Sequence, residues 1–143
     1  MTRRSKRGFG LVLGMSLLGL GSVAVAQGAA RELTVSEVLM ARGVADHEPS
    51  EPGTSFAHDS GSLVCFVRVE NGTRAEGAIL VAFESAEGEA APARGGLRLT
   101  VPARPHHRTY ARTSSNRPAG NYRCVVRSED GAVLGQAPFT ITE

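Results

Sequence analysis

The stretch AGNYRCVV, residues 119–126, decides which fold we expect for this chain. Tyr122, Cys124 and Val126 alternate with Asn121 and Arg123, and successive side chains of a β-strand point to opposite faces of a sheet. The stretch therefore predicts a strand that turns a tyrosine, a cysteine and a valine toward one face. Because the opposite face carries the polar side chains, we expect the cysteine face to be buried.

A second stretch, SLVCFVRVE at residues 62–70, has the same period of two. Its cysteine, Cys65, shares a face with Leu63, Val67 and Val69. Two cysteines in a small exported domain usually pair. We predict a Cys65–Cys124 disulfide, which would close a loop of about 60 residues and stabilise the fold by roughly 4 kcal/mol. Two buried free thiols are the alternative.

Turn-forming residues separate further alternating segments. Asn71-Gly72 and Asp130-Gly131 are strong turn dipeptides, and residues 85–96 form a polar loop rich in Gly, Ala and Pro. Residues 32–42 also fit a helix, but their all-β surroundings favour a strand. The seven strands that we expect span residues 32–40, 62–70, 77–84, 96–101, 107–113, 121–127 and 132–142.

Seven short strands with inward-facing cysteines predict an all-β fold, an immunoglobulin-like antiparallel β-sandwich. In such domains a tyrosine two residues before the second cysteine, as Tyr122 is here, forms a tyrosine corner with the nearby backbone. Immunoglobulin domains also bury a Trp against the bridge, and this chain has no Trp. We therefore predict the architecture and not membership of the immunoglobulin family.

The first 26 residues have the features of a secretory signal peptide. Four basic residues within residues 2–7 precede an apolar run that ends in Ala24-Val25-Ala26, a small-residue cleavage motif. We predict an exported protein, periplasmic or extracellular, whose single domain spans residues 27–143. The paired arginines at positions 3 and 4 leave twin-arginine export open beside the general route, and an uncleaved membrane anchor is the alternative to cleavage.

The chain resembles the bacterial domain-of-unknown-function family 2914 in the order and spacing of four segments: GVADHEPSEPGTSF (43–56), LVCFVRVENGT (63–73), RTYART (108–113) and GNYRCVVRSEDGAVLGQAPFTI (120–141). The resemblance implies an exported β domain without an established activity. The resemblance implies that the characteristic positions of the family correspond here to Glu48-Pro49, Arg108-Thr109-Tyr110, and Asp130-Gly131 with Leu134. The chain departs from the family at Val81 and Phe83, where the family tends to have His and Trp, so any role of that pair would be absent here.

Charge is unevenly distributed after residue 26, where the chain holds 12 Arg, no Lys and 14 acidic residues, a net charge of −2. Residues 27–91 hold 4 Arg against 11 acidic residues, whereas residues 92–128 hold 8 Arg and no acid, with His106 and His107 among the arginines. The planar fork of Arg suits carboxylate, phosphate or sulfate. We predict a face that binds an anionic envelope polymer or an acidic partner protein, provided that the strands carrying the arginines lie near each other. Its binding residues would be Arg104, Arg108, Arg112, Arg123 and Arg127.

Two other interpretations stay open. If strands of the acidic and basic segments interleave, the arginines pair internally with neighbouring acids. An envelope metal protein or hydrolase is the second alternative, because residues 46–59 contain ligand and triad residue types, although no zinc, calcium or triad pattern is met. The residues of that alternative are His47, Glu48, His58, Asp59 and Ser60.

We predict no metal, no cofactor and no catalytic residue, and therefore a binding or structural module that is not an enzyme. Nucleic acid is not an expected partner, because export argues against it, the net charge is negative and aromatic residues for base stacking are few. We expect membrane contact only through an uncleaved signal. Asn71-Gly72-Thr73 is a formal glycosylation sequon, but a hairpin turn at Asn-Gly is the simpler explanation and the one that we predict.

Overall fold

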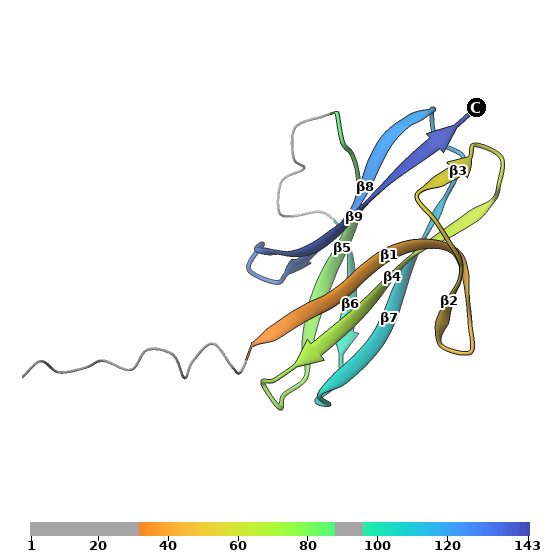
Figure 1. Ribbon diagram of the computed structural model, residues 1–143. Coiled ribbons are helices and arrows are strands. Elements are labelled where there is room, and N and C mark those ends of the chain that lie inside the picture. The colour runs from red at the N-terminus through yellow and green to blue at the C-terminus, as the bar shows by residue number, and fades with distance from the viewer. Residues whose placement is uncertain (1–31, 88–95) are drawn as a thin grey trace, which may run out of the picture.

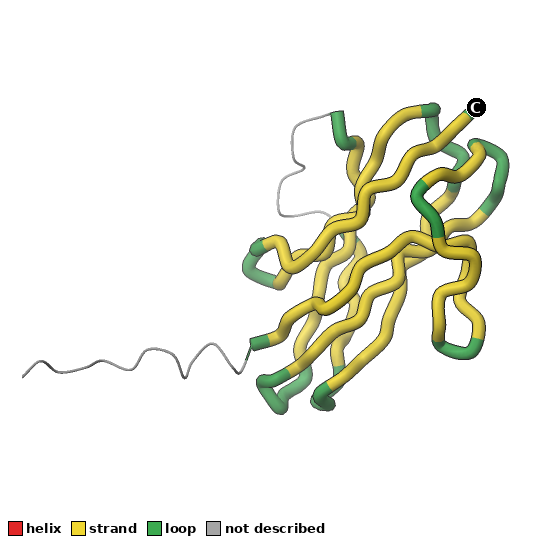
Figure 2. The backbone as a smooth tube through the Cα atoms, viewed as in Figure 1, coloured by secondary structure: helices red, strands yellow, loops and turns green. Residues whose placement is uncertain are grey.

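The computed structural model describes residues 32–87 and 96–143, and in these segments the chain consists of strands and turns without a helix (Figures 1 and 2). These segments accordingly contain no helix that is long and apolar enough to cross a membrane. The predicted signal peptide, residues 1–26, lies outside the described residues, as do most of the predicted loop at 85–96 and Arg94. The strands are β1 (Leu33–Ala45), β2 (Glu48–Pro52), β3 (Ser55–Ala57), β4 (Ser62–Asn71), β5 (Gly77–Ser85), β6 (Leu97–Val101), β7 (His106–Ser114), β8 (Gly120–Ser128) and β9 (Val133–Thr142).

The strands form two sheets that pack face to face (Figure 1). The four-stranded sheet has the order β2-β1-β4-β7, and the five-stranded sheet has the order β3-β9-β8-β5-β6. Neighbouring strands run antiparallel, except that β3 lies parallel to β9. The predicted all-β, immunoglobulin-like sandwich is therefore confirmed.

The core lies between the two sheets. The side chains that line it recur at every second position of β4 and β8, as predicted. On β4 the inner face is fully buried and carries Leu63 and Val67, and on β8 Val126 belongs to the same cluster. Complete burial of a Val or Leu side chain contributes about 1.5–3 kcal/mol. The period of two thus supplies the main driving force that holds the sheets together.

The Cys65–Cys124 disulfide crosses this core from β4 to β8 and joins the two sheets. The two Cα atoms are 6.4 Å apart, within the usual range for bridged cysteines, and both side chains are completely buried. The predicted bridge is confirmed. The sequence left open whether it joins neighbouring strands or opposite sheets, and the structure shows that it joins opposite sheets.

Tyr122 forms the expected tyrosine corner. Its hydroxyl donates a hydrogen bond of 2.6 Å to the backbone carbonyl of Pro118, four residues upstream. Its ring stacks on Phe139 of β9 with the ring centroids 5.7 Å apart. The residue thereby fixes the chain that enters β8, the strand that also carries Cys124.

All seven predicted strands are present, and two more lie in residues 46–59, where we expected a loop. β1 continues to Ala45 and turns through Asp46 and His47 into β2, so residues 32–42 are strand and not helix. A short parallel pairing with β9 adds β3. Asp130-Gly131 does form the predicted turn between β8 and β9, with Gly131 at a φ of 94°.

The prediction of a hairpin turn at Asn71-Gly72 is wrong, because β4 and β5 belong to different sheets. Asn71 is instead buried, and its side chain holds the connection between these strands by hydrogen bonds to the backbone. Its side-chain nitrogen donates to the carbonyls of Ala75 and Pro102 at 2.8 and 3.0 Å, and its side-chain oxygen accepts the backbone N–H of Thr73 at 3.0 Å. A glycan would replace one of the two hydrogens on this nitrogen, so at least one of the donated bonds would be lost.

Replacing Asn71 by Asp is expected to lower the free energy of unfolding by about 2–3 kcal/mol, because a carboxylate cannot donate and would face two carbonyl oxygens. Urea unfolding measures the loss. Asn116→Asp is the matched control, since Asn116 is exposed and should cost less than about 0.5 kcal/mol. Equal effects at the two sites would contradict the role that we assign to Asn71.

Candidate anion-binding site

β7 is the edge strand of the four-stranded sheet, and it carries two of the predicted binding arginines on its outer side. Arg108 lies opposite Arg68 of β4, and Arg112 lies opposite Val64, whereas Ala111 between them faces the core. The prediction that Arg108 and Arg112 point the same way is therefore confirmed. The guanidinium of Arg112 lies over the ring of Tyr110, 5.3 Å from its centroid.

Arg123 and Arg127 do not share this face, because they lie on β8 of the five-stranded sheet. The neighbours of β8 are β5 and β9, and the neighbour of β7 is β4. The two sets of arginines thus project from opposite layers of the sandwich. We predicted a single face of five arginines only if the strands that carry them lie near each other. Since β7 and β8 belong to different sheets, the five arginines do not form one face.

Arg123 and Arg127 instead contact one carboxylate, that of Glu84 on β5. Arg123 Nε lies 3.3 Å from Glu84 Oε2, and Arg127 Nη1 lies 3.0 Å from Glu84 Oε1. The side chains of Glu84 and Arg127 are only 5% and 8% exposed. Among the described residues Glu84 Oε1 has no hydrogen-bond partner, so its attraction to Arg127 is Coulombic rather than a directed hydrogen bond.

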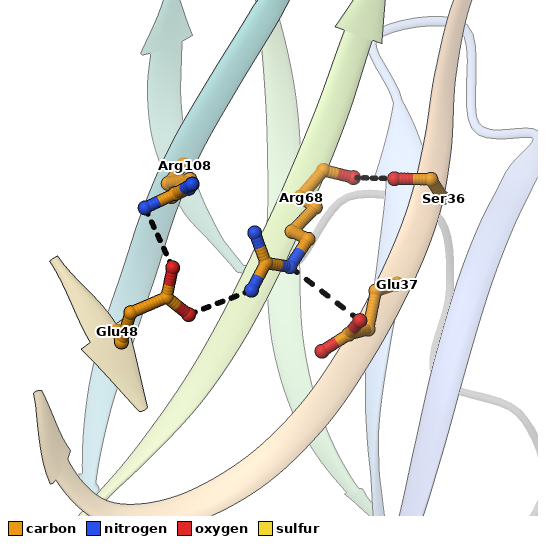
Figure 3. A network of polar contacts seen from close by, with 5 residues as sticks. All are labelled: Ser36, Glu37, Glu48, Arg68 and Arg108. Atoms are coloured by element: carbon orange, nitrogen blue, oxygen red, sulfur yellow. Dashed lines mark hydrogen bonds and ion pairs between the residues drawn. The ribbon is translucent and has the colours of Figure 1, made fainter. Parts of the chain in front are cut away.

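A second charged network lies on the outer face of the four-stranded sheet (Figure 3). The carboxylate of Glu48 stands between two arginines, with one oxygen 2.6 Å from Arg68 and the other 2.6 Å from Arg108. Arg68 also lies 3.4 Å from Glu37, and its backbone carbonyl accepts a hydrogen bond from Ser36. Arginines of the basic segment therefore do pair with acids of residues 27–91: Arg108 pairs with Glu48, and Arg123 and Arg127 pair with Glu84.

The Glu48 contacts also place the β1–β2 hairpin. In a flat sheet β2 and β7 would be three strand spacings, roughly 14 Å, apart. Because Glu48 on β2 reaches Arg108 on β7, the start of β2 leans over the outer face of the sheet. Phe66 on this face is 1% exposed and lies under the Arg68 guanidinium, 5.4 Å away.

A basic hollow of about 510 Å³ opens where this hairpin meets the start of β7. One wall comes from the β1–β2 turn, one from the β6–β7 connection and one from β7 itself. Its lining contains no carboxylate, and among the described residues Arg104 has no ion-pair partner. The lining residues are His47, Arg104, His106, His107 and Arg108.

The electrostatics of the hollow favour an incoming anion. Burial lowers the pKa of His107, and the neighbouring Arg104 guanidinium lowers it further. His107 is therefore neutral at pH 7 in the free protein, and its imidazole has one N–H to donate. Arg104 stays charged, and Arg108 shares its charge with Glu48.

The alternative site in residues 46–59 is not assembled. His47, in the β1–β2 turn, lies beside the start of β7, whereas His58 lies beside its end. There the hydroxyl of Ser115 donates to the His58 carbonyl, and the His58 ring contacts the Arg117 carbonyl at 2.7 Å. Within residues 32–87 and 96–143, no three His, Cys, Asp or Glu side chains gather closely enough to hold a metal. The hydroxyl of Ser60 donates to the Ala57 carbonyl, outside any triad arrangement.

Arg104 and Arg108 were predicted as binding residues from the sequence, whereas His47 was predicted only for the alternative site in residues 46–59. His106 and His107 could be found from the compact basic run RPHHR, residues 104–108. His47 reaches the hollow only because of the two-residue turn before β2. The dipeptide Asp-His is not a recognised hairpin turn, so no local pattern predicted its position.

Comparisons with known proteins give no function. No protein-family model matches the sequence, and no curated protein matches it. Two crystal structures of the β-glucosidase from Kluyveromyces marxianus, one labelled with selenomethionine and one in complex with glucose, are similar to 78% of this chain at 14% identity and a TM-score of 0.43. The chain spans 14% of the length of that enzyme. A likeness of this extent says nothing about activity, and the resemblance to family 2914 stays a prediction.

Proposed function

We propose that this protein is an exported, non-catalytic binding module that holds an anionic group of an envelope polymer or of an acidic partner protein in the hollow around Arg104. The observation that carries the proposal is the lining of that hollow, which gathers five basic side chains and no acid in a domain of net charge −2. Arg104 and Arg108 are central, and Arg112 extends the same face along β7. Arg123 and Arg127 are assigned to the internal contact with Glu84.

Export supports an envelope ligand. The basic and apolar N-terminal stretch predicts secretion, and the Cys65–Cys124 disulfide is consistent with an oxidising compartment. A periplasmic or extracellular protein meets phosphorylated, sulfated or carboxylated polymers at the cell surface. Arg presents its donors in a geometry that suits these groups.

Charge reversal at Arg104 tests this function. We expect Arg104→Glu to weaken binding to lipopolysaccharide or an acidic polysaccharide by about tenfold or more, because a charge-assisted contact worth roughly 1.5–3 kcal/mol is lost. Wild-type binding should also weaken as salt rises, since exposed charges are screened. Binding of the purified protein is measured across a salt series.

Arg42→Glu is the matched control, because Arg42 is an exposed arginine whose side-chain bond to the Ser60 carbonyl lies near the far end of β7. It makes the same change in net charge away from the hollow. Equal losses in the two variants would show that only net charge matters. Binding that neither variant weakens would reject the hollow as the site.

A further inference from the structure

The turn that brings His47 to the hollow is conformationally strained. Ala45 pairs with Glu48, so Asp46 and His47 form a two-residue hairpin turn, and their φ values are 51° and 62°. Two positive φ values define the type I′ turn, in which Asn-Gly and Asp-Gly are preferred because glycine adopts this conformation without steric cost. A histidine at the second position is therefore unfavourable for the turn itself.

Contacts within the described residues do not account for this strain. The imidazole of His47 has no hydrogen bond or ion pair in the described parts of the chain, and the side chain is exposed at the rim of the hollow. The next residue, Glu48, is held by Arg68 and Arg108, so the position of the turn over the sheet is fixed. A strained residue that the surroundings hold in place is a candidate for function.

The donors of the hollow approach from three elements. His47 comes from the β1–β2 turn, Arg104 from the β6–β7 connection, and His106 and His107 from the start of β7. A planar carboxylate is matched by a single plane of donors, such as the fork of one arginine. A tetrahedral oxyanion presents oxygens in several directions and is suited to donors that converge from several sides.

We propose that the hollow binds a tetrahedral oxyanion, a phosphate or sulfate group on an envelope polymer, and that His47 keeps its strained position because its imidazole binds that group together with His106, His107 and Arg104. The proposal rests on the proposed function, because it names the ligand class of the same hollow. Imidazoles that contact a bound anion gain protons, so binding is coupled to proton uptake.

The charges around the histidines determine the sign of this coupling. Burial lowers the pKa of His107 in the free protein, and the neighbouring Arg104 guanidinium lowers it further. Three acids stand near the histidines, namely Asp46 in the turn, Glu48 against Arg108, and Glu70 opposite His106. A bound dianion adds negative charge beside His107 and favours the protonated imidazole, so affinity increases as pH falls toward the lowered pKa of His107.

Phosphate and sulfate differ in the same pH range. Sulfate remains a dianion, so its affinity should rise steadily as the histidines gain protons. Phosphate loses its second charge within the range tested, a monoester near pH 6 and inorganic phosphate roughly one pH unit higher, so its affinity should level off below that pH. The dependence of affinity on pH thus distinguishes a sulfate group from a phosphate group.

The experiment uses the purified protein and follows histidine ring resonances by NMR during titration with sodium phosphate, sulfate and acetate at constant ionic strength and pH 5.5, 6.5 and 7.5. We expect phosphate and sulfate to shift the resonances of His47, His106 and His107 together, and acetate to bind more weakly. Sulfate affinity should rise about tenfold from pH 7.5 to 5.5, which corresponds to uptake of about half a proton over two pH units.

Two variants separate binding from turn stability. His47→Gly relieves the positive φ at the second turn position and is expected to raise the melting temperature by about 2–4 °C, whereas Asp46→Gly replaces a residue that the first position already favours and should change it less. Only His47→Gly removes an imidazole from the hollow, so it should weaken sulfate binding about tenfold at pH 6 and flatten the pH profile. Asp46→Gly should bind sulfate at least as tightly as the wild type.

The outcomes distinguish this proposal from the proposed function. If Arg104→Glu abolishes binding but acetate binds as tightly as sulfate, or His47→Gly binds like the wild type, the oxyanion proposal is overturned and the anion-binding function stands. If none of the three anions shifts the histidines and Arg104→Glu leaves polymer binding unchanged, both are overturned. Loss of sulfate binding in His47→Gly with a raised melting temperature supports the proposal, because misfolding cannot explain it.

Discussion

The double variant Cys65→Ala with Cys124→Ala is expected to lose about 4 kcal/mol of unfolding free energy. The bridge joins residues 59 positions apart, so its removal restores a large loop-closure entropy to the unfolded chain. Both sulfur atoms are completely buried between the sheets, and their loss leaves a small cavity that adds to the cost. Urea unfolding measures the change, which is a large part of the 5–15 kcal/mol typical of a domain.

Reduced wild-type protein is the control for this prediction. A reductant opens the same loop but leaves both sulfur atoms in the core, so it should cost slightly less than the double variant. A loss below about 1 kcal/mol in both samples would contradict the stabilising role of the bridge. Alkylation without prior reduction checks the bridge directly, because an increase in intact mass would reveal free thiols.

The core of this fold was predictable because its determinants are local. Cys65 and Cys124 each lie in a stretch with polar residues at alternate positions toward one end, so the inner faces of β4 and β8 could be named from the sequence. The position of Tyr122 relative to Cys124 predicted a tyrosine corner, and its bond to the Pro118 carbonyl confirms it. Each of these inferences needs only a few neighbouring residues.

Strand neighbours were not predictable in the same way. Asn71-Gly72 has the composition of a hairpin turn, yet the chain crosses there from one sheet to the other, and the asparagine is used for its side-chain hydrogen bonds to Thr73, Ala75 and Pro102. Likewise, alternation places Arg108 and Arg123 on the outer faces of their strands but cannot say that β7 and β8 lie in different sheets. Pairing depends on contacts between residues distant in the sequence.

The candidate site depends on a further feature that the sequence hides. β2 has the sequence EPSEP, whose prolines and exposed residues lack the alternation of a strand. It forms because the turn at Asp46-His47 returns the chain along β1, and because Glu48 is held by Arg68 and Arg108. The same turn brings His47 to the hollow, so the site could be recognised only with the hairpin in place.

Glu84→Gln is the second substitution for which we expect a large loss of stability, about 3 kcal/mol. The change keeps the size of the side chain but removes the negative charge between Arg123 and Arg127. Arg127 is 8% exposed and would become an uncompensated buried cation, which costs roughly 3–5 kcal/mol in proteins. Arg123 is 26% exposed, so it can turn toward water and contributes less. Urea unfolding again provides the measurement.

Glu129→Gln is the matched control, since it makes the same chemical change in a pair with Arg98 that is more than half exposed. It should cost no more than about 0.5 kcal/mol, because solvent screens such pairs. The combined variant Glu84→Met with Arg127→Met should recover most of the stability lost in Glu84→Gln, because apolar side chains of similar volume often replace a buried ion pair without loss. Equal small losses for Glu84→Gln and Glu129→Gln would mean that solvent reaches Arg127, and they would return Arg123 and Arg127 to the set of arginines free to bind a ligand.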